Sequence, residues 1–171
     1  MTHQQMAGKK MLLEIDPTSD YNMALTSFVS EAKNNGESLF IVTNRYSTLH
    51  SVFSEAANVN FLLLTSKTSY PQQISGHETL LPASDLSVML DANAKIQKTE
   101  VNKPINLLFD NLSDVILRCG FEKTYKFTRF LLEAISSPKT TALFVFIPTA
   151  HDPVVTSSIR GLFQNQLAYT G

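Results

Sequence analysis

The chain has 171 residues, of which 43% are hydrophobic and 17% charged, and its formal net charge at pH 7 is −1. This composition excludes a disordered protein and suits one domain with a sizeable core. The small net charge excludes a bulk attraction for nucleic acid or for an anionic membrane, so either contact would need a local patch. The single cysteine, Cys119, excludes an internal disulfide, and a cytoplasmic location is expected. No apolar run reaches the roughly 18 residues of a membrane-spanning helix.

The first half of the chain alternates apolar runs with amphipathic stretches. Residues 1–9 are polar, and we interpret them as a flexible tail before a single domain over residues 10–171. An apolar run ending at Asp16 predicts the first strand, and Asp20 and Gly36 are placed to cap the helix that follows. Further strands are expected at 38–43 and 59–65. The helix expected between them, 47–57, would turn four side chains inward: Leu49, Val52, Phe53 and Ala56.

The second half opens with a polar stretch, 66–84, which we interpret as a functional or mobile loop because it is long for a compact domain. A long helix is expected at 122–135, with five side chains at core spacing: Phe127, Phe130, Leu131, Ala134 and Ile135. The other expected elements are a helix at 85–97, strands at 104–110 and 140–147, a helix near 153–163 and a short edge strand at 166–170.

Continuous apolar strands separated by helices predict a parallel sheet that is covered on both faces. Right-handed crossovers make this an α/β protein, a three-layer α/β/α sandwich with a mainly parallel central sheet. Ligands of such sheets bind outside the carboxyl ends of the strands. The residues expected there are Asp16 to Asp20, Asn44, Arg45, Thr65 to Thr68, Asp110, Asn111 and Pro148 to Asp152.

Two parts of this pattern resemble a known family. Residues 104–135, with the strand and turn at 140–153, resemble the second half of a KaiC-like, RecA-fold ATPase domain, in which a buried strand ends in the Walker B aspartate. Residues 24–43 resemble the first helix and second strand of that family. The resemblance covers about 10–165, and it is closest to compact, mostly archaeal members without a recognisable phosphate loop. It implies a RecA-like, P-loop NTPase-like core and an archaeal source.

The resemblance also implies that the ATPase machinery is degenerate. The family's phosphate loop requires a glycine-rich turn, a lysine for the β- and γ-phosphates and a Ser or Thr for Mg²⁺. Tyr21 stands where the lysine belongs, and Asn44 and Arg45 follow the second strand where the family has its catalytic glutamate. Asp110 alone matches, at the Walker B position. The degenerate Walker A position comprises Asp16, Pro17, Thr18, Ser19, Asp20, Tyr21 and Asn22.

This loop has a physical interpretation. The N-terminus of a helix offers free N–H groups and a partial positive charge to a phosphate. Asp20 is expected to take those donors itself as the N-cap, and Asp16 adds a second negative charge. Two unit charges about 4 Å apart repel by about 4 kcal/mol at an intermediate dielectric, enough to cancel ordinary phosphate affinity. No cofactor is expected.

Each candidate residue has a structural alternative. Asp110 either holds Mg²⁺ through water or, as we expect, caps the next turn through the N–H of Leu112 or Ser113. His151 is either a ligand sensor or general base, or a loop histidine before a helix that begins at Asp152 and Pro153. A metal site built from Asp16, Asp20, Asp110 and Asp152 is a weaker alternative, and no metal is expected.

The sequence therefore predicts a catalytically inactive RecA/KaiC-like domain that acts as a protein-binding, scaffold or regulatory module. By resemblance, it is expected to form a homo-oligomer or a hetero-assembly with another RecA-like protein, using the 66–84 loop with Tyr70 and Pro71. One alternative is a nucleotide sensor or weak ATPase that uses Asp110. Another is a DNA-repair or recombination accessory protein, whose support would be a basic helix face at 118–129 and not the net charge.

Overall fold

The computed structural model describes residues 3–169, and within them eight strands form one sheet. The strand order is β4-β5-β3-β2-β6-β7-β1-β8, and every pairing is parallel except that of β4 with β5. The elements are α1 (His3–Met6), β1 (Lys10–Ile15), α2 (Tyr21–Asn34), β2 (Ser38–Asn44), α3 (Thr48–Phe53), β3 (Val59–Thr65), β4 (Gln72–Gln73), β5 (Glu78–Pro82), α4 (Leu86–Thr99), β6 (Ile105–Phe109), α5 (Leu112–Cys119), α6 (Phe121–Ala134), β7 (Thr140–Phe146), the 3-10 turn η1 (Pro148–Ala150), α7 (Pro153–Arg160) and β8 (Asn165–Tyr169).

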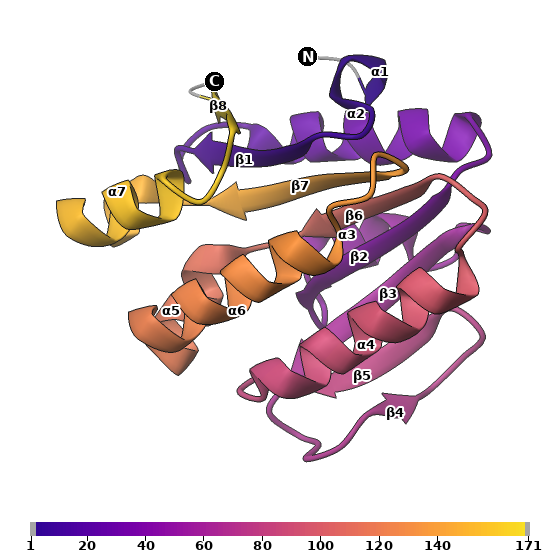
Figure 1. Ribbon diagram of the computed structural model, residues 1–171. Helices are drawn as coiled ribbons and strands as arrows, with labels where there is room; N and C mark the ends of the chain where they lie inside the picture. Colours follow the sequence, from indigo (N-terminus) through magenta and orange to yellow (C-terminus); the bar gives the residue numbers. More distant parts are fainter. Residues whose placement is uncertain (1–2, 170–171) are drawn as a thin grey trace.

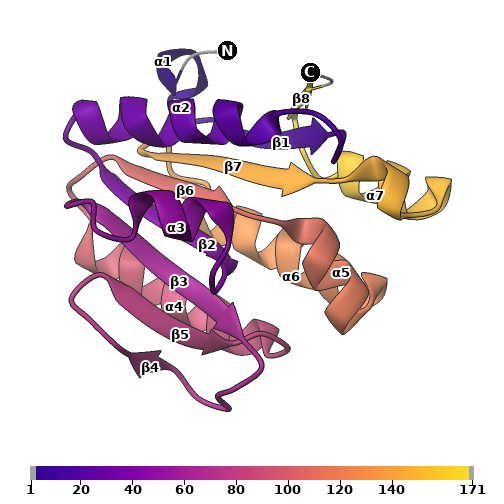
Figure 2. The same ribbon diagram turned by 180° about the vertical axis from the view of Figure 1, so that it is seen from behind.

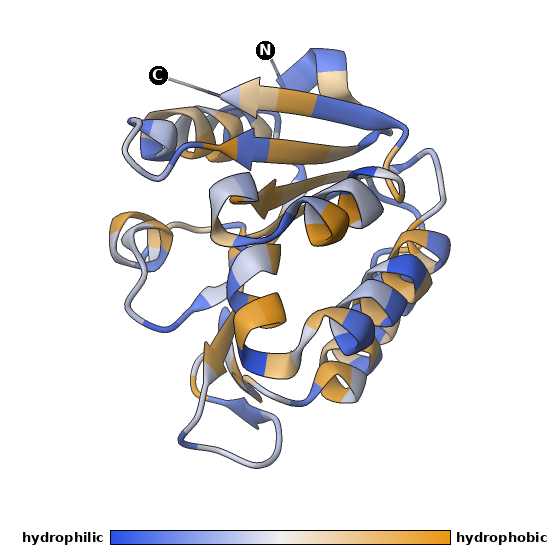
Figure 3. Cartoon of the chain, turned by 90° about the vertical axis from the view of Figure 1, so that its left-hand side faces the viewer, coloured by the Kyte–Doolittle hydropathy of each residue, from blue (hydrophilic) through white to orange (hydrophobic). Residues whose placement is uncertain are grey.

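Helices cover both faces of the sheet, which confirms the predicted three-layer sandwich. Helices α4, α5, α6 and α7 lie on one face (Figure 1), and α2 and α3 lie on the other (Figure 2). Each face of the sheet has its own apolar cluster. Strand β7 contributes to both clusters because successive side chains of a strand point to opposite faces of the sheet. Ala142, Phe144 and Phe146 belong to the α6 side, and Leu143 and Val145 belong to the α2 side. Hydrophobic stretches accordingly run along the strands in Figure 3.

Short polar side chains define where four helices begin, and at the start of α3 Ser47 Oγ accepts the N–H of His50. Asp85 Oδ1 accepts the N–H of Val88 at the start of α4, and Asn111 Oδ1 accepts the N–H of Asp114 at the start of α5. Asp152 Oδ1 accepts the N–H of Val155, 2.9 Å away, which confirms the predicted start of α7. These caps satisfy donors that the first turn of a helix leaves unpaired.

Residues 3–9 are not the flexible tail that their composition predicted. The side chains of His3 and Met6 are buried, and Met6 joins the core on the α2 side. His3 Nε2 lies 2.6 Å from Asn106 Oδ1 at the start of β6 and 3.0 Å from Glu37 Oε2 just before β2. The prediction was wrong because two buried side chains anchor an otherwise polar segment. Residues 1 and 2 lie outside the described part.

Residues 66–84 are not one long loop either. Residues 78–82 form β5, which pairs in parallel with β3 and buries Leu80 and Leu81. The two-residue β4 then adds to β5 in the antiparallel direction. The apolar run of β5 is short and follows a polar stretch, so periodicity alone gave too little signal. Of the edge strand predicted at 166–170, residues 166–169 are in β8 and Thr170 lies outside the described residues.

Two helices present a different face from the predicted one. Val52 is 56% exposed because α3 ends at Phe53 and its Leu49 and Phe53 already form the buried side. In α6, Phe130 is 60% exposed and Ala134 is exposed as well. No helix within residues 3–169 has the length and apolar character needed to cross a membrane.

Candidate functional site

The turn between β1 and α2 is closed by its own hydrogen bonds. Asp16 Oδ1 accepts the N–H of Thr18 at 2.8 Å and the hydroxyl of Thr18 at 2.7 Å. The main-chain oxygen of Asp16 accepts both the N–H of Ser19, at 2.9 Å, and its hydroxyl, at 2.6 Å. The bonds from Thr18 lower the pKa of Asp16, so this carboxylate is ionised at neutral pH. The turn thus carries a fixed negative charge, and the N–H groups of Thr18 and Ser19 are hydrogen-bonded within it.

Asp20 does not act as the predicted N-cap. It precedes α2, but its side chain accepts no capping hydrogen bond. Its backbone, with φ −86° and ψ 48°, departs from the extended conformation that directs a capping side chain at the helix N–H groups. The main-chain oxygen of Asp20 instead accepts the N–H of Met23 at 3.1 Å. The prediction that Asp20 takes the first N–H groups of α2 was wrong, and the hydrogen bonds that close the preceding turn are made by Asp16 to Thr18 and Ser19.

Tyr21, expected from the resemblance to stand at the lysine position, is the first residue of α2. The side chain is half-buried and packs against the apolar cluster on the α2 side of the sheet. Burial raises the pKa of Tyr21, and the charges of Asp110 and Asp114 raise it further. The phenol therefore stays protonated at neutral pH and lies within electrostatic reach of both carboxylates. The first residue of α2 thus contributes a neutral ring and no positive charge to this end of the helix.

Asp110 follows β6 and is held by the neighbouring strand. Its Oδ2 accepts the hydroxyl of Thr43 at 2.9 Å, and its N–H donates to the main-chain oxygen of Val42 at 2.8 Å. Burial raises the pKa of Asp110 and outweighs the hydrogen bonds from Thr43 and Asn111, which lower it. The predicted cap on Leu112 or Ser113 is wrong, because Asn111 caps α5 instead.

A polar network that the sequence did not predict joins β2, α5 and the end of β5. Asn44 Nδ2 donates to Asp114 Oδ2 at 2.8 Å, and Arg118 Nη2 donates to Asn44 Oδ1 at 3.1 Å. Arg118 Nη1 also donates to the main-chain oxygen of Ala83 at 3.0 Å. The signal in the sequence was the spacing of Asp114 and Arg118, four residues apart on a helix that directly follows a strand end.

Two predicted residues keep a buried nitrogen without a partner in the described chain. They are Arg45, at Nε, and His151, at Nε2. The guanidinium of Arg45 lies 5.1 Å from the centre of the Tyr46 ring. The imidazole of His151 stacks on Phe146, with ring centres 5.2 Å apart and planes 8° from parallel. Burial lowers the pKa of His151, which favours the neutral ring.

The predicted strand-end cluster is therefore not one constellation. No hydrogen bond or ion pair in the part of the chain that is described joins Asn44 or Arg45 to His151 or Asp152. Residues 3–169 also contain no group of three His, Cys, Asp or Glu side chains that could hold a metal. Asp16, Asp20, Asp110 and Asp152 thus do not come together as such a group within these residues.

Comparison with known proteins shows a fold and no family. No family model and no curated protein matches the chain. A protein from Pyrococcus horikoshii OT3 known by a project number is 13% identical, with a TM-score of 0.70, over 98% of this chain and 87% of its own. A KaiC-like protein from the same hyperthermophilic archaeon is 14% identical, with a TM-score of 0.67, over 96% of this chain and 73% of its own. The chain thus has the fold of a KaiC-like, RecA-type domain.

Proposed function

We propose that this chain is a RecA-type domain that no longer hydrolyses nucleotide and acts as a protein-binding, scaffold or regulatory module in the cytoplasm. The observation that carries the proposal is the closed turn before α2, in which Asp16 holds Thr18 and Ser19 while Tyr21 takes the lysine position. The fold is retained although the residues that would act on a phosphate are replaced.

Three properties of the turn disfavour a triphosphate. The N–H of Thr18, which would face a phosphate in an open loop, already donates to Asp16. The ionised Asp16 would repel an incoming anion, and the neutral phenol of Tyr21 would supply no counter-charge. Backbone N–H groups and a cation are what phosphate binding at a helix N-terminus requires.

The remaining catalytic positions support the same proposal. Asn44, the last residue of β2, is bonded to Asp114 and Arg118, and Arg45 follows it. Neither residue can serve as a carboxylate base. Asp110 is bonded to Thr43, and its raised pKa makes it a weaker ligand for Mg²⁺ than an ordinary carboxylate. We propose, from the fold shared with a KaiC-like protein, that the partner is a second copy or another RecA-like protein.

Calorimetry and thermal unfolding with ATP–Mg²⁺ test the proposal. A nucleotide present at 100 times its Kd would stabilise the fold by about 2.7 kcal/mol, so we expect no rise in Tm at millimolar ATP. Light scattering behind size exclusion, with and without ATP–Mg²⁺, should give an assembly that does not depend on nucleotide.

Two variants make this test sharper. Tyr21→Lys restores the missing cation, and we expect it to leave the protein without measurable ATPase activity because the turn stays closed. Asp110→Asn removes the one matching residue, and we expect no change in nucleotide response. A wild-type rise in Tm with ATP–Mg²⁺ that disappears in Asp110→Asn would establish the nucleotide-sensor alternative instead.

A further inference from the structure

A groove on the outer surface lies between the first turns of α4 and α6. It has a volume of 510 Å³, and its lining comes from the start of α4, the end of α5 and the outer side of α6. The apolar part is formed by the partly exposed Leu86 and Leu90 of α4, while Phe127 of α6 contributes only an edge because it is 3% exposed. Phe130 also lines the groove and is 60% exposed, which is unusual for a large aromatic side chain on a helix of a lone domain.

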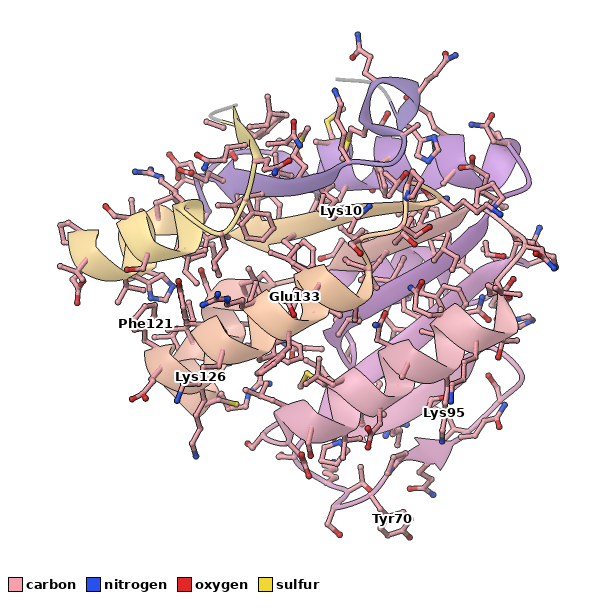
Figure 4. All side chains as sticks on the ribbon, in the orientation of Figure 1. Lys10, Tyr70, Lys95, Phe121, Lys126 and Glu133 are labelled. Carbon is pink, nitrogen blue, oxygen red and sulfur yellow. The ribbon has the colours of Figure 1, made fainter. Side chains whose placement is uncertain are left out.

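Cations surround this apolar surface. Arg118, Lys123 and Lys126 line the groove, and Figure 4 labels Lys126 on α6. Arg118 donates only to the neutral oxygens of Ala83 and Asn44, and Lys123 forms no ion pair with any carboxylate in residues 3–169.

One carboxylate, Asp85, lines the groove, and a second, Glu122, pairs with a lysine of the lining. Lys126 pairs with Glu122 at 3.1 Å, but both side chains are exposed, so the pair contributes little. The carboxylate inside the groove, Asp85, accepts the N–H of Val88 and the hydroxyl of Ser87. These neutral donors lower the pKa of Asp85 and leave it ionised, so the lining carries three cations against one carboxylate and is locally positive on a chain whose net charge is −1.

We propose that this groove binds an acidic amphipathic helix of a partner protein. Apolar side chains at helical spacing would pack on Leu86, Leu90 and the exposed ring of Phe130. Carboxylates on the flanks of that helix would meet Lys123, Lys126 and Arg118. A helix seated in an apolar groove is a recurrent mode of recognition, and the cations give it a preference by charge.

The lining favours a peptide over the other occupants. Single-stranded nucleic acid needs a row of aromatic faces for its bases, whereas Phe130 is the one exposed aromatic of this lining and Phe127 is buried beneath it in the core. The acidic turn of a second copy, residues 16–20, is closed by Asp16 and presents no apolar side to the groove. Since the groove is an attachment site for a partner, the inference rests on the proposed function.

Fluorescence anisotropy with a labelled peptide of about 18 residues, leucine on one face and glutamate on the other, tests the groove on the full chain. Its comparison probes are a scrambled peptide of the same composition, a twin with lysine in place of glutamate, and an oligo-thymidine of about 20 nucleotides. We expect the acidic amphipathic peptide to bind most tightly and to weaken as salt is raised.

Charge and apolar contact are separated by matched variants. Lys123→Glu/Lys126→Glu should lower the affinity about tenfold or more, and Phe130→Ser by about tenfold. The controls are Lys67→Glu/Lys98→Glu, which reverses two exposed charges outside the groove, and Val154→Ser, which removes an exposed apolar side chain of α7. Both should bind as the wild type does, and all four variants alter exposed residues, so circular dichroism should confirm that they fold.

Several outcomes would overturn the inference. They are acidic-peptide binding no tighter than that of the scrambled peptide, equal loss in the control variants, or groove-dependent binding of the oligo-thymidine. Light scattering that shows a wild-type dimer dissociated by Phe130→Ser would make a second copy the occupant. If the acidic peptide does not bind and ATP–Mg²⁺ has no effect, the groove proposal fails and the proposed function remains. If the protein hydrolyses ATP, the proposed function fails, and the peptide-binding result still decides the groove proposal.

Discussion

The two ends of the sheet differ in whether their buried polar side chains have hydrogen-bond partners. At the amino ends, His3 and Asn106 are buried and bond to each other and to Glu37. At the carboxyl ends, Arg45 and His151 each keep a buried nitrogen without a partner in the described chain, and burial raises the pKa of Asp110. A fully paired network stabilises a fold, while incompletely paired groups at the ligand-binding edge are typical of a functional site, present or former.

The largest expected effect breaks the paired end. His3→Ala leaves Asn106 Oδ1 and Glu37 Oε2 without their shared partner and removes a ring that lies 5.3 Å from the ring of Phe28. We expect a loss of about 2–3 kcal/mol in the free energy of unfolding, measured by urea denaturation. Gln4→Ala, at an exposed neighbour, is the control and should be neutral. A loss as small in His3→Ala as in the control would show that residues 3–9 add no stability.

A smaller effect, a gain in stability, is expected at the carboxyl ends of the strands. Asp110→Asn keeps an oxygen that can accept the hydroxyl of Thr43 and removes a buried negative charge. We expect a gain of about 1 kcal/mol at pH 7, or about 2–4 °C in Tm. Thr43→Val removes the donor and is expected to destabilise the protein. Destabilisation by both variants would mean that the ionised carboxylate is a paired structural group like those at the amino ends.

The pH dependence of this gain follows from the direction of the pKa shift. Because the folded pKa of Asp110 is raised, its contribution to stability is complete below the ordinary carboxyl range and is lost as pH rises through the raised value. The advantage of Asp110→Asn should therefore vanish near pH 3 and grow towards pH 7. Parallel stability curves for the two proteins between these limits would contradict the shift.

The smallest effect concerns His151. Burial lowers its pKa, so its contribution to stability is present above about pH 6.5 and is lost as the pH falls through the lowered value. His151→Phe keeps a ring over Phe146 and removes the titration, so its Tm should fall less than that of the wild type between pH 7 and about pH 5. His77→Phe, in an exposed loop, should retain the wild-type dependence. Identical slopes in all three proteins would assign the acid sensitivity elsewhere.

Hydrophobic periodicity was enough to predict the layers and most of the sheet, but it misplaced the buried side of α6. Thr124 and Thr128 face the core because their hydroxyls donate to the main-chain oxygens of Gly120 and Thr124, each at 2.8 Å. A threonine whose hydroxyl bonds to the main chain of its own helix counts as polar in a hydropathy pattern, but it can be buried like an apolar residue in the fold. Phe130 is displaced to the outer side as a result.

The candidate site shows the same limit. The acidic character of the turn at 16–20 could be predicted from its residues, but the choice of Asp16 over Asp20 depends on backbone angles that the sequence does not encode locally. The pairing of Asn44 with Asp114 and Arg118 depends on β2 and α5 meeting in space. Spacing within one element predicts which side chains share a face, and tertiary packing decides what they meet.

The position of β1 in the sheet has a consequence for synthesis on the ribosome. Its two neighbours are β7 and β8, so Leu12 finds its sheet partners, Phe144 and Gln166, only after nearly the whole chain has been translated. Until then the apolar side chains of β1 have no strand to pair with, and such late, long-range closure slows folding and favours aggregation. A nascent chain truncated before β7 should thus depend on chaperones to remain unaggregated.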